Sequence, residues 1–266
     1  MGWRAGSLSD EDPVLKTYSE RWYESRKRGA RQSARVVLPM VYDAIRPMSV
    51  VDLGCGTGSW LAVFHEMGVR ELLGIDAPHL DLSQLEIPRA QFVAHDLSAP
   101  LELDRQFDLA LSLEVGEHLV PERAELLITE LTALAPVVLF SAAVPGQGGT
   151  GHRNEQWPEY WAARFGDRGF RPYDFLRARL WRDDRVRYFY AQNVVLYVRG
   201  ADADRFPLLP AADPYLPLSL VHPRLLERTQ RAFPRPRDVS GRELGYFVGR
   251  MVRHAFGRPT RRDDRA

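Results

Sequence analysis

The sequence predicts an α/β fold in which a mostly parallel, seven-stranded sheet carries helices on both faces. Three observations predict it. Short apolar runs alternate with helical windows from residue 48 onward, a glycine turn follows the first run, and that run is apolar enough to be buried on both faces. Ligands of such sheets bind beyond the carboxyl ends of the strands, so we expect a site at that edge.

Residues 13–46 precede the sheet and are predicted to be helical. Apolar and aromatic residues recur there at spacings of three and four, the pattern of a helix with one buried stripe. Pro47 ends the segment. The stripe consists of Val14, Leu15, Tyr18, Trp22, Tyr23, Val36, Val37, Met40, Val41 and Ile45.

The strands and helices of the sheet domain follow in order. The predicted strands are 49–53, 71–75, 91–94, 107–113 and 137–140, closed by 170–176 and 193–198. The predicted helices lie near 59–67, 122–135 and 157–165. We therefore divide the chain into an N-terminal helical segment (1–46), a Rossmann-like sheet domain (47–200) and a C-terminal extension (201–266). The extension is rich in proline and arginine, and its predicted helices lie near 218–232 and 242–256.

Composition limits the class of protein. The 266 residues are 45% hydrophobic and 27% charged, as in globular proteins, and the net charge of +1 gives no field that would recruit nucleic acid or an anionic membrane. The single cysteine, Cys55, excludes an intrachain disulfide. No signal-peptide core and no apolar run of about 20 residues is found, so we expect a cytoplasmic protein.

The strongest motif joins the first strand to the next helix. Asp52 ends the strand, and Gly54, Gly56 and Gly58 alternate before the helix begins. Glycine lacks a Cβ, so the backbone turns tightly and a ligand can lie on it. The spacing is G-x-G-x-G and not the dinucleotide spacing G-x-G-x-x-G. This variant favours a zwitterionic amino acid, whose ammonium the strand-end carboxylate meets, over a pyrophosphate.

Acidic residues also end the next two strands. Asp76 is placed to accept hydrogen bonds from ribose hydroxyls, and Asp96, followed by Leu97, is placed beside an adenine amino group. A tight turn with two solvated aspartates is the structural alternative. The succession of a glycine turn and acids at three strand ends is more specific than any one of these elements.

These residues resemble the class I S-adenosylmethionine (SAM)-dependent methyltransferases over roughly residues 30–200. The resemblance implies that the three glycines lie under the methionine part of SAM, Asp52 near its amino group, Asp76 at the ribose, and Asp96 with Leu97 at the adenine. Later motifs resemble a bacterial subfamily found among natural-product and surface-polysaccharide genes. They are FDL at 107–109, SLEVGEHL at 112–119, GGTGHRNEQW at 148–157 and YAQN at 190–193. Gly116 stands where related chains often have alanine, and we expect little effect.

His118 is the first candidate for a catalytic residue, with Glu117 beside it. Both follow the fourth strand, where the methyl group of SAM is expected. Methyl transfer is an in-line displacement, and a hydroxyl acceptor must lose a proton. A neutral imidazole is suited to take that proton, because its pKa lies near working pH. The alternative is that His118 caps or packs at the start of the next helix.

A divalent cation (Mg²⁺, Mn²⁺ or Zn²⁺) is a further hypothesis for the same region. Glu114, Glu117 and His118 have the spacing of one side of a helical turn, and His152 lies in the loop after the adjacent fifth strand. Two carboxylates and two imidazoles can hold a cation that acidifies an acceptor hydroxyl. The pattern resembles the metal-dependent small-RNA 2′-O-methyltransferases. In the alternative, Glu114 hydrogen-bonds SAM or backbone, Glu117 is solvated, and His152 orders the loop or touches substrate.

Other residues carry weaker signals. The polar loop 145–157 is predicted to form part of the acceptor pocket. Trp157, Tyr160 and Trp161 are its candidate walls, although a core role is favoured for Trp161. Arg28, Arg31 and Arg35 are in reach of a SAM carboxylate or an acidic substrate, but a solvated helix face is the favoured interpretation. Cys55 is interpreted as a small filler of the glycine turn.

The sequence thus predicts a SAM-dependent methyltransferase with a small-molecule acceptor. O-methylation of a hydroxylated natural product or sugar, with His118 as general base, is preferred. The alternatives are a metal-dependent RNA 2′-O-methyltransferase, which the near-neutral charge disfavours, a natural-product N-methyltransferase, and a non-catalytic SAM-binding protein. The glycine spacing disfavours a nicotinamide-dependent reductase. The arginines between 224 and 265 indicate a solvated or oligomer-contacting surface, which leaves a homodimer as one option.

Overall fold

A computed structural model of the chain describes residues 20–78, 80–210 and 217–232, without the side chains of 20–27 and 230–232. The chain divides into two compact units, Met1–His222 and Pro223–Ala266. The first unit contains the predicted helical segment, the sheet domain and the start of the extension. Val14, Leu15, Tyr18 and the predicted helix 242–256 lie outside the described residues.

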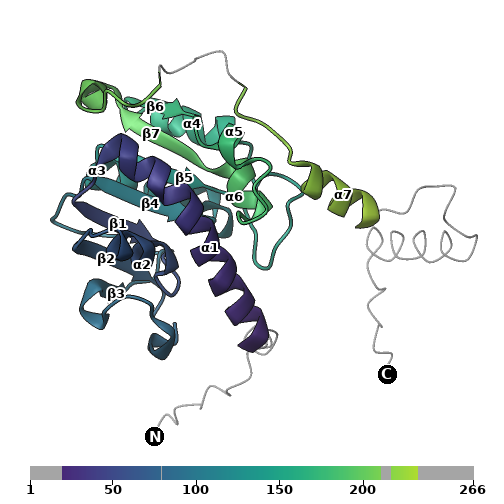
Figure 1. The fold of residues 1–266 in the computed structure, drawn as a ribbon, viewed down its shortest axis with the longest axis horizontal. Coiled ribbons are helices and arrows are strands. Elements are labelled where there is room, and N and C mark those ends of the chain that lie inside the picture. Colours follow the sequence, from purple (N-terminus) through teal and green to yellow (C-terminus); the bar gives the residue numbers. More distant parts are fainter. Residues whose placement is uncertain (1–19, 79, 211–216, 233–266) are drawn as a thin grey trace, which may run out of the picture. The chain divides into compact units, whose positions relative to one another are not determined.

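The first unit is built on one seven-stranded sheet (Figure 1). The strands are β1 (Ser49–Leu53), β2 (Glu71–Asp76), β3 (Phe92–Ala94), β4 (Leu109–Leu113), β5 (Val137–Ser141), β6 (Phe170–Tyr173) and β7 (Val195–Arg199). Their order is β3-β2-β1-β4-β5-β7-β6. β7 runs antiparallel to β5 and β6, and the remaining pairs are parallel. The predicted fold class is confirmed.

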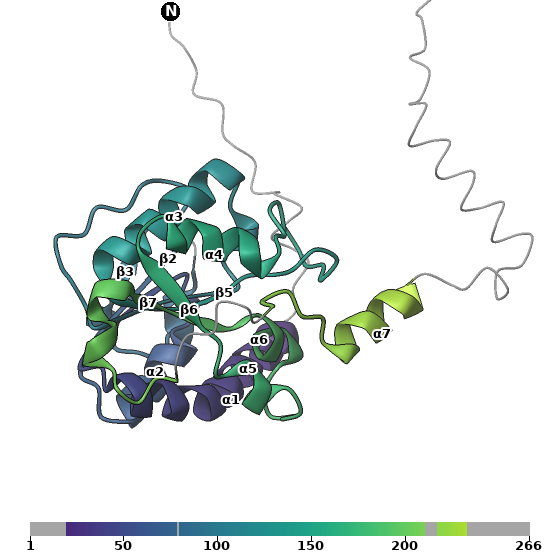
Figure 2. The same ribbon diagram turned by 90° about the horizontal axis from the view of Figure 1, so that it is seen from above.

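Helices cover both faces of the sheet, as Figure 2 shows. One face carries α1 (Glu20–Ile45), α2 (Ser59–Glu66), α5 (Arg177–Leu180) and α6 (Tyr188–Asn193), and the other carries α3 (Pro121–Leu134) and α4 (Pro158–Gly166). Each layer has its own apolar core. Val37 and Val41 of α1 are fully buried on the first face, and Leu127 and Leu131 of α3 are fully buried on the second. Burial of both faces is the reason that the central strands are continuously apolar.

Short 3₁₀ helices connect these elements. They are η1 (Leu82–Gln84), η2 (Arg89–Gln91), η3 (Gly116–His118) and η4 (Gly200–Arg205). The second unit begins with α7 (Pro223–Ala232). No helix among residues 20–78, 80–210 and 217–232 is long and apolar enough to cross a lipid bilayer.

The first helix follows the sequence prediction over the described residues, whereas the last strands differ from it. α1 continues through Pro39, whose exposed position lets water replace the lost backbone hydrogen bond, and it ends before Arg46, which has a φ of 51°. The predicted strand 170–176 ends at Tyr173, because Asp174 pairs with Arg177 in the helical turn that follows. The predicted strand 193–198 begins at Val195, because residue 193 closes α6.

The register brings the functional loops to one edge. Asp52 of β1 lies opposite Gly74 of β2 and Leu111 of β4, and Leu113 of β4 lies opposite Ser141 of β5. The loops that follow these four parallel strands therefore leave the sheet at the same edge.

Candidate active site

The glycine turn after β1 adopts a conformation that side chains resist. Gly54, Gly56 and Gly58 have φ values of 86°, 55° and 83°, in the left-handed region. A Cβ on Gly54 would lie 2.3 Å from Cγ2 of Val115, whereas a Cβ on Gly56 would meet nothing within 4 Å. The turn is therefore packed at its first glycine and open at its second, which leaves room for a ligand to lie on the backbone.

Two of the predicted acids converge on this turn. Asp76 accepts hydrogen bonds from the backbone N–H groups of Gly56 (2.6 Å) and Ala77 (2.7 Å). Asp52 is only 2% exposed, and burial, followed by the charge of Asp76, raises the pKa of its carboxyl to about 7. A buried carboxylate is unfavourable unless a positive group meets it. The ammonium of a bound amino acid would supply that group.

The third acid lies at the neighbouring strand end. Asp96 is exposed, and its Oδ1 accepts a hydrogen bond from Ser98 N at 2.8 Å. Leu97 is 8% exposed and belongs to the core on the α3 side of the sheet. The structure thus places Asp52 and Asp76 at the carboxyl ends of β1 and β2 and Asp96 just beyond the end of β3, while the Leu97 side chain is directed into packing.

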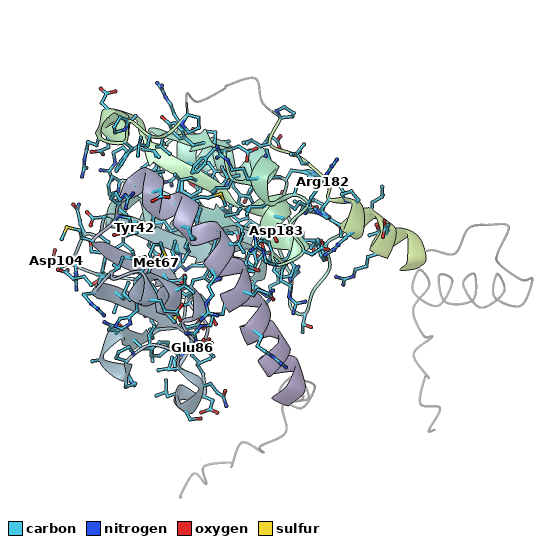
Figure 3. The ribbon with its side chains drawn as sticks, viewed as in Figure 1. Tyr42, Met67, Glu86, Asp104, Arg182 and Asp183 are labelled. Atoms are coloured by element: carbon cyan, nitrogen blue, oxygen red, sulfur yellow. The ribbon has the colours of Figure 1, made fainter. Side chains whose placement is uncertain are left out.

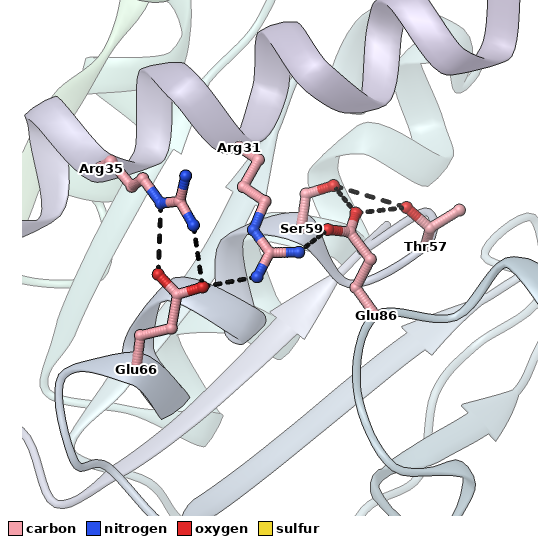
Figure 4. A network of polar contacts seen from close by, with 6 residues as sticks. All are labelled: Arg31, Arg35, Thr57, Ser59, Glu66 and Glu86. Carbon is pink, nitrogen blue, oxygen red and sulfur yellow. Dashed lines mark hydrogen bonds and ion pairs between the residues drawn. The ribbon is translucent and has the colours of Figure 1, made fainter.

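Glu86 joins the glycine turn to α1, a link that the sequence reasoning missed. Its carboxylate accepts hydrogen bonds from Thr57 Oγ1 (3.2 Å) and Ser59 Oγ, and it pairs with Arg31 of α1 (Figure 4). The Glu86 side chain is only 5% exposed. Figure 3 shows it on the face of the sheet that α1 covers, together with Tyr42 and Met67.

The N-terminal arginines therefore do not form a merely solvated face. Arg31 pairs with both Glu86 and Glu66, and Arg35 pairs with Glu66 at 3.1 Å. Arg35 and Arg28 are exposed, as the favoured interpretation expected. Arg31, in contrast, ties α1 to the glycine turn through Glu86.

The prediction that Glu114, Glu117 and His118 share one helical turn is wrong for Glu114. The helical turn η3 begins only at Gly116, and Glu114 has a φ of 58°. Its backbone N–H donates to Ser141 O on β5, and its carboxylate accepts from Gln147 Nε2 (2.7 Å) and Asn193 Nδ2 (3.1 Å). Burial raises the pKa of Glu114, and the bonds from Asn193 and Gln147 oppose that rise. Its position is set by the end of the strand and by two amides.

Glu117, His118 and His152 do come together. One ligand atom from each lies within 4.8 Å of the others, and the two imidazole rings are 4.9 Å apart in an edge-to-face arrangement. Glu117 is 1% exposed, and its Oε2 has no hydrogen-bond partner in the described part of the chain. Burial, followed by the charge of Glu114, raises the pKa of Glu117 well above its ordinary value. The alternative in which Glu117 is solvated is therefore excluded.

The loop after β5 delivers His152 to this cluster. The backbone N–H groups of Arg153 (2.8 Å) and Asn154 (3.0 Å) both donate to the carbonyl of Glu117. Glu114, at the end of β4, is not in the cluster, because its carboxylate is turned toward Gln147 and Asn193. The four predicted metal ligands thus divide into a group of three and one residue held apart by amides.

Most of the remaining candidate residues belong to the packing of the protein. Trp161 is 2% exposed and packs on Phe140 at 5.1 Å, so it belongs to the core, whereas Trp157 is 42% exposed. A Cβ on Gly116 would lie 2.8 Å from Trp161 Cη2, so glycine at this position makes room for that ring. Cys55 is buried and its thiol pKa is raised by burial, which agrees with its interpretation as a filler.

Comparison with known proteins identifies the family of this chain. Residues 24–182 match a family described as a methyltransferase domain. A stretch of 91 residues is 35% identical to malonyl-(acyl-carrier protein) O-methyltransferase of Pseudescherichia vulneris. That stretch covers 34% of this chain and 36% of the relative, so the chain spans about a third of the length of the curated relative that it matches.

Solved structures show the same fold. A sugar N-methyltransferase from a Streptoalloteichus species is similar with a TM-score of 0.54 and 16% identity, over 75% of this chain and 99% of that one. An amino pentose methyltransferase from Micromonospora echinaspora, with SAM bound, gives a TM-score of 0.53 and 15% identity, over 74% of this chain and 100% of that one.

Proposed function

From the premise that this chain belongs to the methyltransferase domain family and is a SAM-dependent methyltransferase, we propose that it methylates a hydroxyl of a small molecule. SAM is held at the ends of β1, β2 and β3, and the acceptor meets it beside Glu117, His118 and His152. One observation carries the acceptor half of this proposal. It is the buried carboxylate of Glu117, whose Oε2 has no hydrogen-bond partner among the described residues and which offers a ligand atom within 4.8 Å of those of two imidazoles.

The residues at the first three strand ends fit SAM. The open space over Gly56 accommodates the methionine part, and the ammonium of SAM gives the buried Asp52 a positive partner. Asp76 has lone pairs beyond its two backbone bonds to offer to ribose hydroxyls. The exposed Asp96 is proposed to contact the adenine, and Leu97, whose side chain packs in the core, is proposed to contribute through its backbone. Bound SAM supplies a methyl group on a sulfonium, and these residues orient it toward the end of β4.

The second cluster fits a divalent cation. One carboxylate and two imidazoles are ligands that Zn²⁺ or Mn²⁺ accepts, and Mg²⁺ stays among the candidates. An ion held there would lower the pKa of an acceptor hydroxyl. The role of Glu114 as a fourth metal ligand or as a SAM contact stays a prediction. In either role its carboxylate would have to keep its hydrogen bonds from Gln147 and Asn193 beside the new contact, or give them up.

Without a cation, His118 receives the proton of the acceptor. It is the exposed member of the cluster, so an incoming hydroxyl reaches it first. The two roles exclude each other at one ring nitrogen, because a nitrogen bound to a cation cannot accept a proton. Activity in the presence of a chelator separates them.

A hydroxyl acceptor explains this cluster better than an amine does. A neutral amine is a nucleophile without deprotonation, whereas a hydroxyl needs a base or a cation to lose its proton. The solved sugar N-methyltransferase shares the fold, so N-methylation is the second candidate for a sugar or natural product. The net charge of +1 gives no support for an RNA acceptor. The homodimer stays a prediction, because most of the arginines behind it lie outside the described residues.

Calorimetric titration with S-adenosylhomocysteine (SAH) tests the cofactor half. Binding in the micromolar range is expected for the wild type, with loss of binding in Asp76→Ala. Asp104→Ala is the matched control, since Asp104 is exposed and lies in the segment between β3 and β4, outside the assigned site. Equal SAH affinity in both variants would refute the assigned site.

Turnover of hydroxylated acceptors in EDTA, with Mg²⁺, Mn²⁺ or Zn²⁺ added back, tests the acceptor half. We expect EDTA and His152→Ala each to abolish metal-dependent turnover. Wild-type activity that is unchanged in EDTA would refute the cation and leave His118 as the base.

A further inference from the structure

We propose that Glu155 is the positioning residue of His152. Its carboxylate holds the imidazole as the Nδ1–H tautomer, so that Nε2 becomes the ring atom that accepts a proton or binds a cation. This inference rests on the role proposed for His152 in methyl transfer. It gives a role of its own to Glu155, which the sequence predicted only as part of the acceptor loop 145–157.

The hydrogen bond between the two side chains determines the tautomer. His152 Nδ1 lies 2.8 Å from Glu155 Oε1. An ionised carboxylate has acceptor atoms only, so the hydrogen of this bond must be on Nδ1. In a neutral imidazole the second nitrogen then carries a lone pair.

Glu155 is itself held in place by the loop. Its Oε2 accepts from the backbone N–H of Gly146 at 2.9 Å, and its Oε1 accepts from the backbone N–H of Gly148 at 2.8 Å. Both glycines have positive φ values, 83° and 66°, which turn their N–H groups toward the carboxylate. Both side chains are largely shielded, with 11% of His152 and 20% of Glu155 exposed. The carboxylate is thus fixed before any ligand binds.

The loop also makes room for the imidazole on its other side. A Cβ on Gly149 would lie 2.1 Å from His152 Nε2, so a side chain at this position would displace the ring. The next residues, Arg153 and Asn154, are bonded to the carbonyl of Glu117. The imidazole of His152 thus contacts Glu155 through Nδ1, while its ring lies 4.9 Å from that of His118, a member of the cluster in which it acts. Carboxylates that orient a ligating histidine in this way typically change metal affinity about 10–100-fold when removed.

The competing role for Glu155 is to brace the loop without any influence on the imidazole. The tautomer of His152 separates the two roles. It is read in the full-length protein, labelled with ¹⁵N-histidine, by long-range ¹H–¹⁵N correlation at a pH well above the ordinary histidine pKa of about 6.5. The His152 signals are identified by their loss in His152→Ala.

We expect the Nδ1–H tautomer of His152 in the wild type and in Glu102→Gln, an exposed control. In Glu155→Ala we expect a mixture or the Nε2–H tautomer, with SAH affinity unchanged as evidence that the fold persists. An Nε2–H tautomer in the wild type would overturn the proposal even if the variant does not fold. A pure Nδ1–H tautomer in folded Glu155→Ala would overturn it as well.

A titration of the SAH complex with Mn²⁺ or Zn²⁺ separates this proposal from the proposed function. We expect Glu155→Ala to lower the affinity about 10–100-fold, and Glu102→Gln to leave it unchanged. Absence of metal binding in the wild type would refute the cation of the proposed function, while the tautomer measurement would still decide the role of Glu155. Equal metal affinity in the wild type and Glu155→Ala would overturn the positioning role.

Discussion

Acidification should weaken SAH binding through Asp52. Burial and the neighbouring Asp76 raise the pKa of this carboxyl to about 7 in the ligand-free protein. Only the ionised form pairs with the ammonium of the ligand, so protonation of Asp52 competes with binding. The competition lies within an accessible pH range because the carboxyl is buried; an exposed aspartate, with a pKa of about 3.9, would be ionised throughout.

The size of the effect follows from that pKa. The apparent dissociation constant scales with one plus the ratio of protonated to ionised Asp52. Between pH 7.5 and pH 5.5 this factor rises from about 1.3 to about 33, so affinity should fall about 25-fold, or about 1.9 kcal/mol. The ammonium of the ligand, with an α-amino pKa of about 7.7–8.0, is about 60–75% charged at pH 7.5 and fully charged at pH 5.5. Allowing for this, the expected fall in affinity becomes about 15- to 19-fold.

The stability of the ligand-free protein should change in the opposite direction. A carboxyl whose pKa is raised on folding binds more protons in the native state than in the unfolded state between pH of about 4 and about 7. The contribution of Asp52 to stability therefore falls as pH rises through that window, while SAH affinity increases. A change in pH that acts on the whole protein would be expected to move stability and SAH affinity in the same direction, so opposite changes point to Asp52.

Calorimetry of SAH binding across the range, at constant ionic strength, measures the first effect, and thermal unfolding without ligand measures the second. Asp52→Asn is the control, because it removes the charge and keeps the shape. It should bind SAH as weakly as the protonated wild type and lose the pH dependence. A wild-type affinity that is flat from pH 7.5 to 5.5, or a slope that Asp52→Asn retains, would refute the reasoning.

Two further predictions test the supports of the SAM site. Gly54→Ala should lower the free energy of unfolding by more than about 1 kcal/mol in thermal or denaturant unfolding, because it combines a φ of 86° with a contact to Val115. Gly166→Ala, which meets open space at the end of α4, should be neutral or stabilising, and equal losses in the two variants would contradict this account. Arg31→Met should cost about 1–3 kcal/mol of stability and weaken SAH binding in calorimetry, because it leaves Glu86 buried without its cation. Arg35→Met should cost less than about 1 kcal/mol, since its pair with Glu66 is more exposed, and a larger effect of Arg35 than of Arg31 would be inconsistent with the network in Figure 4.

The sheet was predictable because its signals are local. Buried strands bounded by glycine or acid mark β1 and β2 in the sequence itself, and their bounds differ from the prediction by no more than one residue. The start of β7 was not predictable, because residues 188–193 form a helix whose last two side chains take part in long-range bonds. Asn193 donates to Glu114, and Gln192 accepts from the backbone N–H of His222. Such partners cannot be read from a window of neighbouring residues.

The candidate site likewise contains residues that local sequence signals predict and residues that depend on long-range contacts. The convergence of Asp52 and Asp76 on the glycine turn follows from strand order alone, since the carboxyl ends of parallel strands share an edge. Glu86 and Glu155 carry no signal of this kind. Their roles depend on the paths of two different loops. The loop between β2 and β3 brings Glu86 to Arg31 of α1, and the loop after β5 brings Glu155 to His152.

Helical spacing predicted that Glu114, Glu117 and His118 are neighbours on one helical turn. The conformation at the end of β4 explains why this prediction is wrong for Glu114. The chain leaves β4 through a left-handed residue, which directs Glu114 to two amides and starts the helical turn two residues later. Glu114 thereby has hydrogen-bond donors for its carboxylate, whereas one oxygen of Glu117 has no partner in the part of the chain that the structure describes. Residues of one type, three positions apart, thus carry different chemistry. The loop after β5 then completes the cluster by binding the carbonyl of Glu117 and orienting His152. The SAM half of the site is built by strand order and the acceptor half by one loop, so substitutions in that loop can alter the acceptor chemistry while the SAM half keeps its supports.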